Sequence, residues 1–332
     1  MRRVLVTGGA GYIGCCVIEE LLKRGHKPVV FDSFYWGKES LQPVLDKIEI
    51  IEGDCRNSKD VIYALENVDS IIHLAGIVGE AACLRNQKAH FSINVESTRT
   101  LVNCCTDPEM ELVRDFIFAS SCSVYGNVQG MYEEVTETTP TRPLSAYAHA
   151  KLLAEKIILD KAKEIPHFHP TILRLSTVFG WSNRPRLDLV TNAFAYNAWK
   201  NGKLTIHGDG QQYRSLIHVK DIAKAFVDIL EAPRLMRSSE IFHVGEETNN
   251  KTVKEIAETA KALLPNTEIE FITSKKTDRR DYRINCQKIK NVIGWKAEWS
   301  MENGMKDILE NLKTLNLDWE SDKYRNSSYK YV

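Results

Sequence analysis

Short apolar runs alternate with stretches of helical periodicity through the first half of this chain. The runs are four to six residues long and nearly free of polar residues, which is typical of strands buried on both faces of a sheet. They span residues 4–7, 28–31, 48–51, 70–74, 115–120 and 171–175. Amphipathic stretches, which predict helices, lie between them at residues 12–24, 58–66, 87–106 and 146–163. This alternation predicts βαβ units and an α/β fold with a doubly wound parallel sheet.

The alternation becomes less regular after about residue 176. Polar segments that contain glycine or proline, at residues 180–188 and 207–215, interrupt the pattern. Helical periodicity is found at residues 187–200, 219–230, 252–263 and 301–314. We therefore predict a sheet domain over residues 1–176, rejoined by a segment at about 214–245, and a smaller α/β substrate lobe interleaved with it over residues 177–332. The polar and aromatic tail, residues 319–332, predicts either a mobile end or a strap across a neighbour.

Composition and charge narrow the classes of partner. The 332 residues carry 44 basic and 44 acidic side chains, and this balance argues against nucleic acid or an anionic membrane surface and for a small-molecule ligand. No apolar run is long enough to span a membrane, and the apolar N-terminal stretch breaks at residues 7–9, so we expect no signal peptide. The eight cysteines form no CxxC pair and the nine histidines no HExxH motif. We therefore expect reduced thiols, no metal site and a cytoplasmic location.

A glycine-rich loop follows the first expected strand and opens the first expected helix. Its sequence, TGGAGYIG, places Gly8, Gly11 and Gly14 three residues apart. Gly8 permits a tight turn, Gly11 lets the backbone approach a pyrophosphate, and Gly14 allows the helix to pack on the strand. Asp32 ends the second expected strand, near the ~20-residue offset of an acid that binds the adenosine ribose. The alternative interpretation of the glycines is a turn-rich loop, and that of Asp32 is a helix cap or turn residue. Together, however, the two features favour a Rossmann domain that binds NAD rather than NADP.

Tyr147 and Lys151, in the segment SAYAHAK, share one face of an expected helix because they are four residues apart. An ammonium about 4 Å from a phenol is worth roughly 4 kcal/mol at an effective dielectric near 20, which predicts a lowered tyrosine pKa. Tyr147 is then a candidate general base near pH 7. Ser121 follows the fifth expected strand, at the crevice edge of the sheet, and is placed to orient the same hydroxyl. The alternative is a solvated helix face that carries a packed ring.

Four motifs occur in order along the chain: TGGAGYIG, HLAG (73–76), FIFASSCSVYG (116–126) and YAHAK (147–151). With them the chain resembles the extended short-chain dehydrogenase/reductase family, and within it the NAD-dependent nucleotide-sugar epimerases and dehydratases, the group that contains UDP-glucose 4-epimerase. The later segments 208–226 and 288–295 extend the resemblance over nearly the whole chain. It implies NAD as cofactor, a nucleotide-diphosphate sugar as substrate, and a homodimer paired through residues 87–106 and 146–163.

The resemblance also implies roles for individual residues, with Ser121, Tyr147 and Lys151 catalytic. Asp54 is placed to meet the adenine edge, although a simple turn acid is the alternative, and Asn94 steadies the loop after the fourth strand. His73 and His218 are expected to be structural. The cofactor-binding set is Gly8, Gly11, Tyr12, Ile13, Gly14, Asp32, Asp54, Cys55, Leu74, Ala75, Gly76, Asn94, Ser120, Tyr147 and Lys151. The substrate-binding set is Val78, Gly79, Ser121, Ser123, Thr177, Arg186, Asn192, Arg214 and Arg280, with Arg279 as the alternative to Arg280.

The reaction implied is C4 epimerisation through a transient 4-keto sugar, with Tyr147 as base. The 4,6-dehydratases carry an Asp-Glu pair where this chain has Cys122 and Ser123, which disfavours dehydration. Val78 replaces a lysine of the 4-epimerases and Thr177 an asparagine, so the sugar and the nucleotide base stay open. A nucleotide-sugar 4-dehydrogenase or ketoreductase is the alternative enzyme. A non-catalytic NAD(H)-binding sensor is the alternative from another class.

Overall fold

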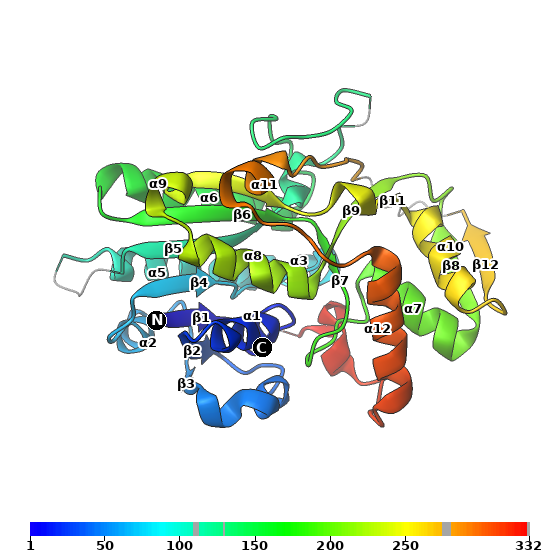
Figure 1. Cartoon of the computed structure of the whole chain (residues 1–332), viewed down its shortest axis with the longest axis horizontal. Coiled ribbons are helices and arrows are strands. Elements are labelled where there is room, and N and C mark those ends of the chain that lie inside the picture. Colours follow the sequence, from blue (N-terminus) through cyan, green and yellow to red (C-terminus); the bar gives the residue numbers. More distant parts are fainter. Residues whose placement is uncertain (109–112, 129, 274–279, 331–332) are drawn as a thin grey trace.

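The computed structural model describes residues 1–108, 113–128, 130–273 and 280–330. Its main element is a seven-stranded sheet in which every neighbouring pair is parallel (Figure 1). In spatial order the strands are β3 Glu49–Glu52, β2 Lys27–Asp32, β1 Arg3–Thr7, β4 Ser70–His73, β5 Asp115–Ser121, β6 His169–Leu175 and β10 Glu240–Val244. This is the Rossmann order with one added strand, so the predicted doubly wound α/β fold is confirmed.

Alternate residues of each central strand face opposite helical layers. Val4 and Val6 of β1 pack toward α1 and α8, whereas Leu5 packs toward α2, α5 and α6. The first layer consists of α1 Gly14–Lys23, α8 Val219–Glu231 and α11 Gln287–Ile293; the second consists of α2 Ser58–Ala64, α5 Ser97–Cys105 and α6 Ala146–Glu164. Because both faces are covered, the strands are continuously apolar rather than alternating.

The second lobe has its own apolar core, which lies beside the carboxyl end of the main sheet (Figure 1). Its helices are α7 Val190–Asn201, α10 Val253–Leu263 and α12 Met301–Thr314. One small sheet contains β7 Thr177–Phe179, β9 Tyr213–His218 and β11 Asn250–Thr252, and another pairs β8 Lys203–His207 with β12 Glu268–Ile272. The short helices are α3 Glu80–Arg85, α4 Gln87–Phe91 and α9 Arg234–Arg237.

The expected elements of the first half are found within two residues of their predicted limits, apart from one helix that is divided. The expected helix at residues 12–24 begins only at Gly14, after the glycine loop. The expected helix at residues 87–106 is instead α4, a π-helical turn Ser92–Glu96 and α5. The π turn changes the register of this helix, and such turns often occur at functional sites.

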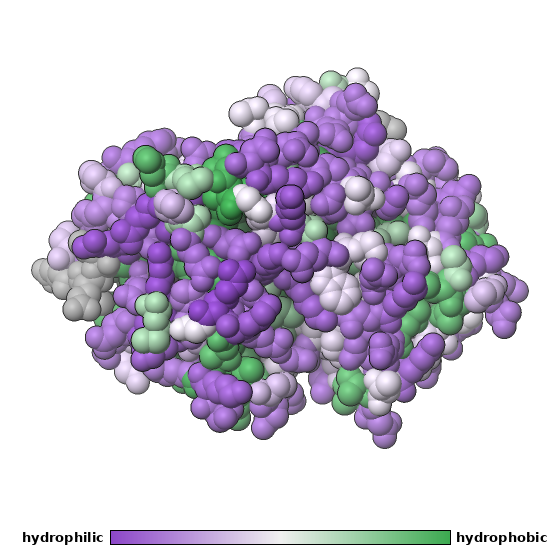
Figure 2. Space-filling model, viewed as in Figure 1, coloured by the Kyte–Doolittle hydropathy of each residue, from purple (hydrophilic) through white to green (hydrophobic). Residues whose placement is uncertain are grey.

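Hydrophilic side chains cover most of the face on which α8 and α12 lie, and apolar side chains form only small separate groups there (Figure 2). None of the described helices is long and apolar enough to cross a membrane. Among all the residues that the structure describes, no three His, Cys, Asp or Glu side chains lie close enough together to hold a metal ion.

Candidate active site

A cavity of about 610 Å³ lies at the carboxyl ends of the central strands. Asp32 and Ser121 end β2 and β5 at its wall, Gly8 and Leu74 directly follow β1 and β4 there, and Tyr147 reaches it from α6. The strand order reverses between β1 and β4, and an open α/β sheet binds its ligands at such a switch point. The position of the cavity therefore follows from the topology of the sheet.

The cavity brings together nearly all of the predicted cofactor set and three of the nine residues of the predicted substrate set. From the cofactor set it is lined by Gly8, Gly11, Tyr12, Ile13, Gly14, Asp32, Asp54, Cys55, Leu74, Ala75, Gly76, Ser120, Tyr147 and Lys151. From the substrate set it is lined by Val78, Ser121 and Arg186. Segments separated by more than a hundred residues thus meet around one space.

The glycine loop has no room for a side chain at Gly8 or at Gly14. Gly8 has φ +72°, and a Cβ there would lie 2.8 Å from the backbone nitrogen of Ala75. A Cβ on Gly14 would lie 2.3 Å from the carbonyl oxygen of Gly8. The loop therefore packs directly on the loop after β4 and on the start of α1, and it leaves the N-terminal N–H groups of that helix at the cavity wall. Such a cradle fits the diphosphate of a dinucleotide.

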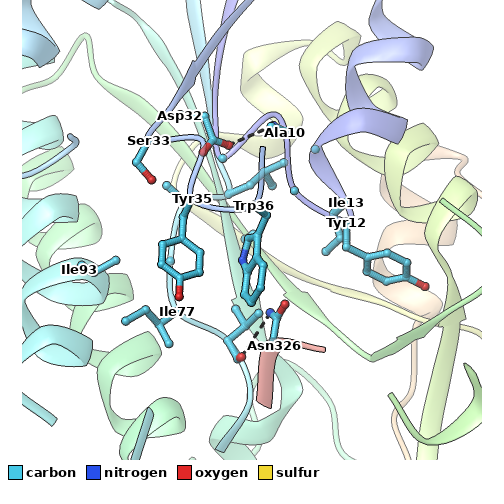
Figure 3. A pocket seen from close by; sticks show the side chains of 18 of the residues that line it. Ala10, Tyr12, Ile13, Asp32, Ser33, Tyr35, Trp36, Ile77, Ile93 and Asn326 are labelled. Carbon is cyan, nitrogen blue, oxygen red and sulfur yellow. Dashed lines mark hydrogen bonds between the residues drawn. The ribbon is translucent and has the colours of Figure 1, made fainter. Parts of the chain in front are cut away.

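Asp32 joins β2 to the glycine loop. Its carboxylate accepts a hydrogen bond from the backbone N–H of Ala10 at 3.0 Å (Figure 3) and another from the backbone N–H of Phe34 at 2.9 Å. Burial raises the pKa of Asp32, and these two hydrogen bonds oppose that shift. Each oxygen keeps a further lone pair, so the carboxylate is still able to accept from a ribose hydroxyl at the cavity wall.

The loop after β4 is held from behind by Asn94 in the π turn. The amide oxygen of Asn94 accepts from Ile77 N–H at 2.7 Å and its nitrogen donates to Ile77 C=O at 2.8 Å. His73, beneath this loop, lies between Thr7 Oγ1 at 2.7 Å and Thr98 Oγ1 at 3.0 Å. Burial lowers the pKa of His73 to about 3, which keeps the ring neutral and structural, as predicted.

Tyr147, Ser121 and Lys151 meet at the inner end of the cavity. The Ser121 hydroxyl is hydrogen-bonded to Tyr147 and also accepts from Ser123 Oγ at 2.9 Å. Lys151 Nζ donates to the carbonyl oxygen of Ala119 at 2.8 Å and lies 5.9 Å from the centroid of the Tyr147 ring. A phenol, a hydroxyl and an ammonium beside a dinucleotide cradle are the groups needed to move a proton on a substrate hydroxyl.

The sequence of residues 4–245 matches the family described as "NAD dependent epimerase/dehydratase family". The chain belongs to this family. Its cofactor is NAD, which the glycine cradle and Asp32 fit.

The proteins and solved structures that resemble this chain carry names that agree with the family. Over 246 residues the chain is 32% identical to a Bacillus subtilis protein named "Uncharacterized UDP-glucose epimerase YtcB", covering 70% of this chain and 74% of that one. It is similar to the solved UDP-glucose 4-epimerase of Thermotoga maritima with UDP-glucose, at 25% identity and TM-score 0.81, covering 94% of this chain and 98% of that one. It is also similar to a solved dTDP-glucose 4,6-dehydratase of Bacillus anthracis in complex with NAD, at 25% identity and TM-score 0.80. That match covers 99% of this chain and 100% of the dehydratase chain.

The pKa values at the inner end of this epimerase/dehydratase site differ from the sequence-based expectation. We predicted that Lys151 lowers the pKa of Tyr147 toward neutrality. Burial instead raises the pKa of Tyr147 to about 12, and the Ser121 hydrogen bond and the cations of Arg186 and Arg280 offset it only in part. Burial also lowers the pKa of Lys151 to about 8. The expected direction differs for the chain's own groups because the expectation gave the attraction between the two charges more weight than the desolvation of both groups.

Asn192 has a different role from the substrate contact that we predicted. It is 1% exposed, and its amide bonds the backbone of Gly180 at 3.0 Å and the hydroxyl of Tyr12 at 3.2 Å. Tyr12 in turn donates its O–H to Gly180 C=O at 2.8 Å. These contacts connect the glycine loop to the second lobe, so Asn192 supports the site without facing it.

Other predicted residues also lie outside the cavity wall. Arg214 donates to the backbone carbonyls of Tyr213 at 2.8 Å and Arg280 at 2.7 Å, which places the two arginines together. Their diphosphate role stays a prediction, and Arg279 lies outside the described residues. His218 stacks on Trp299 at 4.2 Å and is structural, as expected. The predicted residues that do not line the cavity are Gly79, Asn94, Ser123, Thr177, Asn192, Arg214 and Arg280.

Asp54 lines the cavity but its carboxylate is already paired. It accepts from the backbone N–H and from Nε of Arg56, both at 2.9 Å, and these hydrogen bonds lower its pKa. This geometry fits the alternative interpretation of Asp54, an acidic residue that stabilises a turn, better than a contact with adenine.

The cavity residues that the sequence reasoning missed include Tyr35, Trp36, Arg184, Asn326 and Tyr329. In Figure 3 the rings of Tyr35 and Trp36 extend from the end of β2 toward Asn326. Asn326 donates to Val78 C=O at 3.4 Å, and the Tyr35 hydroxyl contacts the backbone of Lys330 at 2.9 Å. The tail is therefore a strap across a wall of this chain's own cavity. No motif signals this, because the partners are far apart in sequence.

Replacing Asp32 by Ala should weaken NAD binding and lower the preference for NAD over NADP at least about tenfold, because a carboxylate that repels a 2′-phosphate is lost. The measurement is the ratio of the two dissociation constants by calorimetry. Asp54→Ala is the matched control and should leave that ratio unchanged, since its carboxylate is paired with Arg56. An unchanged ratio in Asp32→Ala would remove Asp32 from the ribose site.

Proposed function

We propose that the protein is a nucleotide-sugar 4-epimerase that uses NAD and regenerates it within each turnover. The observation that carries this proposal is the grouping of Tyr147, Ser121 and Lys151 beside the glycine cradle, without the acidic pair that removes water. Cys122, at the first position of that pair, is fully buried and its thiol donates to Arg174 C=O at 3.2 Å. Ser123 is 2% exposed and bonds Ser121. Neither group faces the cavity as a carboxylate would.

In the proposed reaction the chain's residues hold and move one proton. Ser121 holds the C4 hydroxyl of the sugar next to the Tyr147 oxygen, and Tyr147 takes the hydroxyl proton as the carbonyl forms. When bound, NAD supplies reversible hydride transfer at its nicotinamide. Tyr147 then returns the proton to the carbonyl oxygen after the keto sugar has turned. With the pKa of Tyr147 about 12, the neutral phenol is ready to act as acid, and a cation beside the ring is needed for its action as base.

Lys151 has two tasks in this scheme. Its ammonium, with a pKa of about 8, is still mostly charged at pH 7 and stabilises a phenolate in the buried site. Its carbonyl contact with Ala119 fixes the ammonium at the floor of the cavity, where it is placed to bind the nicotinamide ribose. Arg186, at the cavity wall beside Asp188, adds a second positive charge that acts on Tyr147.

A nucleotide-sugar panel tests the proposal. UDP-, GDP-, CDP- and dTDP-sugars are each incubated with the full-length protein, and products are identified by NMR. We expect one C4 epimer pair to interconvert without net reduction of added NAD. Steady NADH production would indicate the 4-dehydrogenase instead, and a 4-keto-6-deoxy sugar would indicate a dehydratase. Turnover of no sugar with NAD tightly bound would favour a non-catalytic NAD(H) sensor.

Assembly and location stay predictions. The helices expected to pair in a homodimer carry partly exposed apolar side chains, with Phe91 of α4 and Leu153 of α6 at 45% and 44%. These side chains support a pairing surface on α4 and α6. The cytoplasmic location rests on the sequence arguments alone.

A further inference from the structure

Arg184 is a buried cation whose hydrogen-bonding groups are largely unused. It lies in the segment between β7 and α7, lines the cavity and is only 7% exposed. Its Nε and Nη2 have no hydrogen-bond partner among the residues that the structure describes. Arg186, two residues away, is by contrast bound through Nε and Nη2 to Asp188, both at 3.0 Å. An unpaired buried guanidinium is costly, so its persistence at a cavity wall points to an anionic ligand.

The position of Arg184 identifies the part of the cavity that it serves. Its backbone N–H donates to Ser182 Oγ at 3.3 Å, and the same hydroxyl donates to Tyr12 C=O at 2.7 Å and contacts Cys15 Sγ at 3.0 Å. Tyr12 belongs to the glycine loop and Cys15 to the first turn of α1. Arg184 is thus anchored against the dinucleotide cradle.

The guanidinium is held in place by aromatic rings from distant segments. Its central carbon lies 4.5 Å from the centroid of the Trp36 ring. Trp36 contacts Tyr35 at 4.8 Å and Tyr329 of the tail at 5.9 Å, measured between ring centroids. A stacked guanidinium keeps its edge free for in-plane hydrogen bonds, the geometry in which arginine binds phosphate oxygens in pairs.

Two arginines of this segment line the cavity. Arg186 is paired with Asp188, and the charge of Arg184 acts on these two groups more than on Cys15 and Asp32. The position of Arg184 is set by its stacking on Trp36 and by Ser182, which connects its backbone to Tyr12 of the glycine loop. This position favours the diphosphate of the dinucleotide over that of the sugar nucleotide as the group that Arg184 meets.

We propose that Arg184, stacked on Trp36, binds the diphosphate of NAD and completes with a side chain the anion site that the glycine loop forms with its backbone. This inference rests on the NAD-binding part of the proposed function and is independent of the sugar chemistry. It makes Arg184 a cofactor-binding residue.

The test compares ligands with and without the diphosphate on full-length protein freed of co-purified dinucleotide. Calorimetry gives dissociation constants for NAD, ADP-ribose and adenosine. In Arg184→Ala, binding of NAD and ADP-ribose should weaken roughly 10- to 100-fold, the size of a lost charge-assisted contact, while adenosine changes less than about twofold. Arg56→Ala removes another cavity arginine, one paired with Asp54, and should leave the ratio of ADP-ribose to adenosine affinity within about threefold.

Two further measurements keep the outcome unambiguous. UDP binding to the NAD-saturated protein should be unchanged in Arg184→Ala; weaker UDP binding with unchanged ADP-ribose binding would assign Arg184 to the sugar nucleotide and overturn the proposal. Arg184→Lys keeps the positive charge and replaces the alanine variant in this test if that variant does not fold. It should lower the affinity for ADP-ribose at least about threefold, because the planar guanidinium and its paired donors are lost. Unchanged ADP-ribose affinity in a folded variant also overturns the proposal. Failure of C4 epimerisation would appear only in the product assay and would leave these affinities as they are.

Discussion

Replacing Tyr147 by Phe should lower kcat by roughly 10²- to 10⁴-fold and leave NAD bound, because only the group that moves the proton is lost. The ring packs against an apolar cluster formed by Ile77, Ala82, Cys83 and Ala89, and this packing remains in the phenylalanine variant. The hydrogen bond to Ser121 disappears, but Ser121 keeps its bond from Ser123. The fold should therefore persist, and the loss should fall on the chemical step.

The measurement is single-turnover formation of the sugar product, together with the NAD content of the purified variant. Tyr63→Phe, at a ring that is 61% exposed on α2, is the matched control and should keep full activity. A Tyr147→Phe enzyme with near-normal kcat would remove Tyr147 from the reaction. Loss of bound NAD in the same variant would instead indicate a structural role for the hydroxyl.

Replacing Lys151 by Met should separate activity from stability. Without the ammonium, the Tyr147 phenolate loses its nearest fixed cation on α6, and we expect kcat to fall roughly 100-fold or more. Stability at pH 7 should change little. Removal of a buried charge stabilises the fold, whereas the unpaired Ala119 carbonyl destabilises it, and each effect is worth roughly 1–3 kcal/mol.

The pH dependence of the melting temperature gives a second readout for Lys151. Its pKa is about 8 in the folded protein and 10.5 is its ordinary value, so the folded state disfavours the charged form. The resulting destabilisation is fully present below about pH 8 and is relieved as the pH rises toward 10.5. The Lys151→Met variant should lack this contribution. Lys156→Met, at an exposed lysine on the same helix, is the control and should keep both the activity and the pH dependence. If the melting temperature of Lys151→Met depended on pH in the same way as that of the unchanged protein, the buried-charge explanation would be contradicted.

The sheet and its cofactor end were predictable because their signals are local. An apolar run such as residues 4–7 reports burial on both faces, and the spacing of Gly8, Gly11 and Gly14 reports a turn that only glycine can form. Asp32 follows from its place at the end of a strand. Each of these features depends on residues within one βαβ unit.

The rest of the site depends on contacts between distant segments. Trp36, Arg184 and Tyr329 meet at one wall of the cavity, although nothing in their own neighbourhoods marks them. The family resemblance gave Asn192 to the substrate, but its amide is bonded to the backbone of Gly180 and to Tyr12 of the glycine loop. The pKa of Tyr147 depends on how completely the residues packed around it, such as Ala82 and Cys83 of α3, exclude water, and the spacing of residues in the sequence does not give this.

Strand β10 has a consequence for how the protein is made. It completes one edge of the main sheet by pairing with β6, yet it is synthesised only after the chain has passed through β7, α7, β8 and β9. Until residues 240–244 have left the ribosome, β6 presents an unpaired row of backbone donors and acceptors. Such an edge is a template for pairing with another chain. A fragment that ends at residue 176 would keep this edge open permanently and should aggregate where the full-length protein does not.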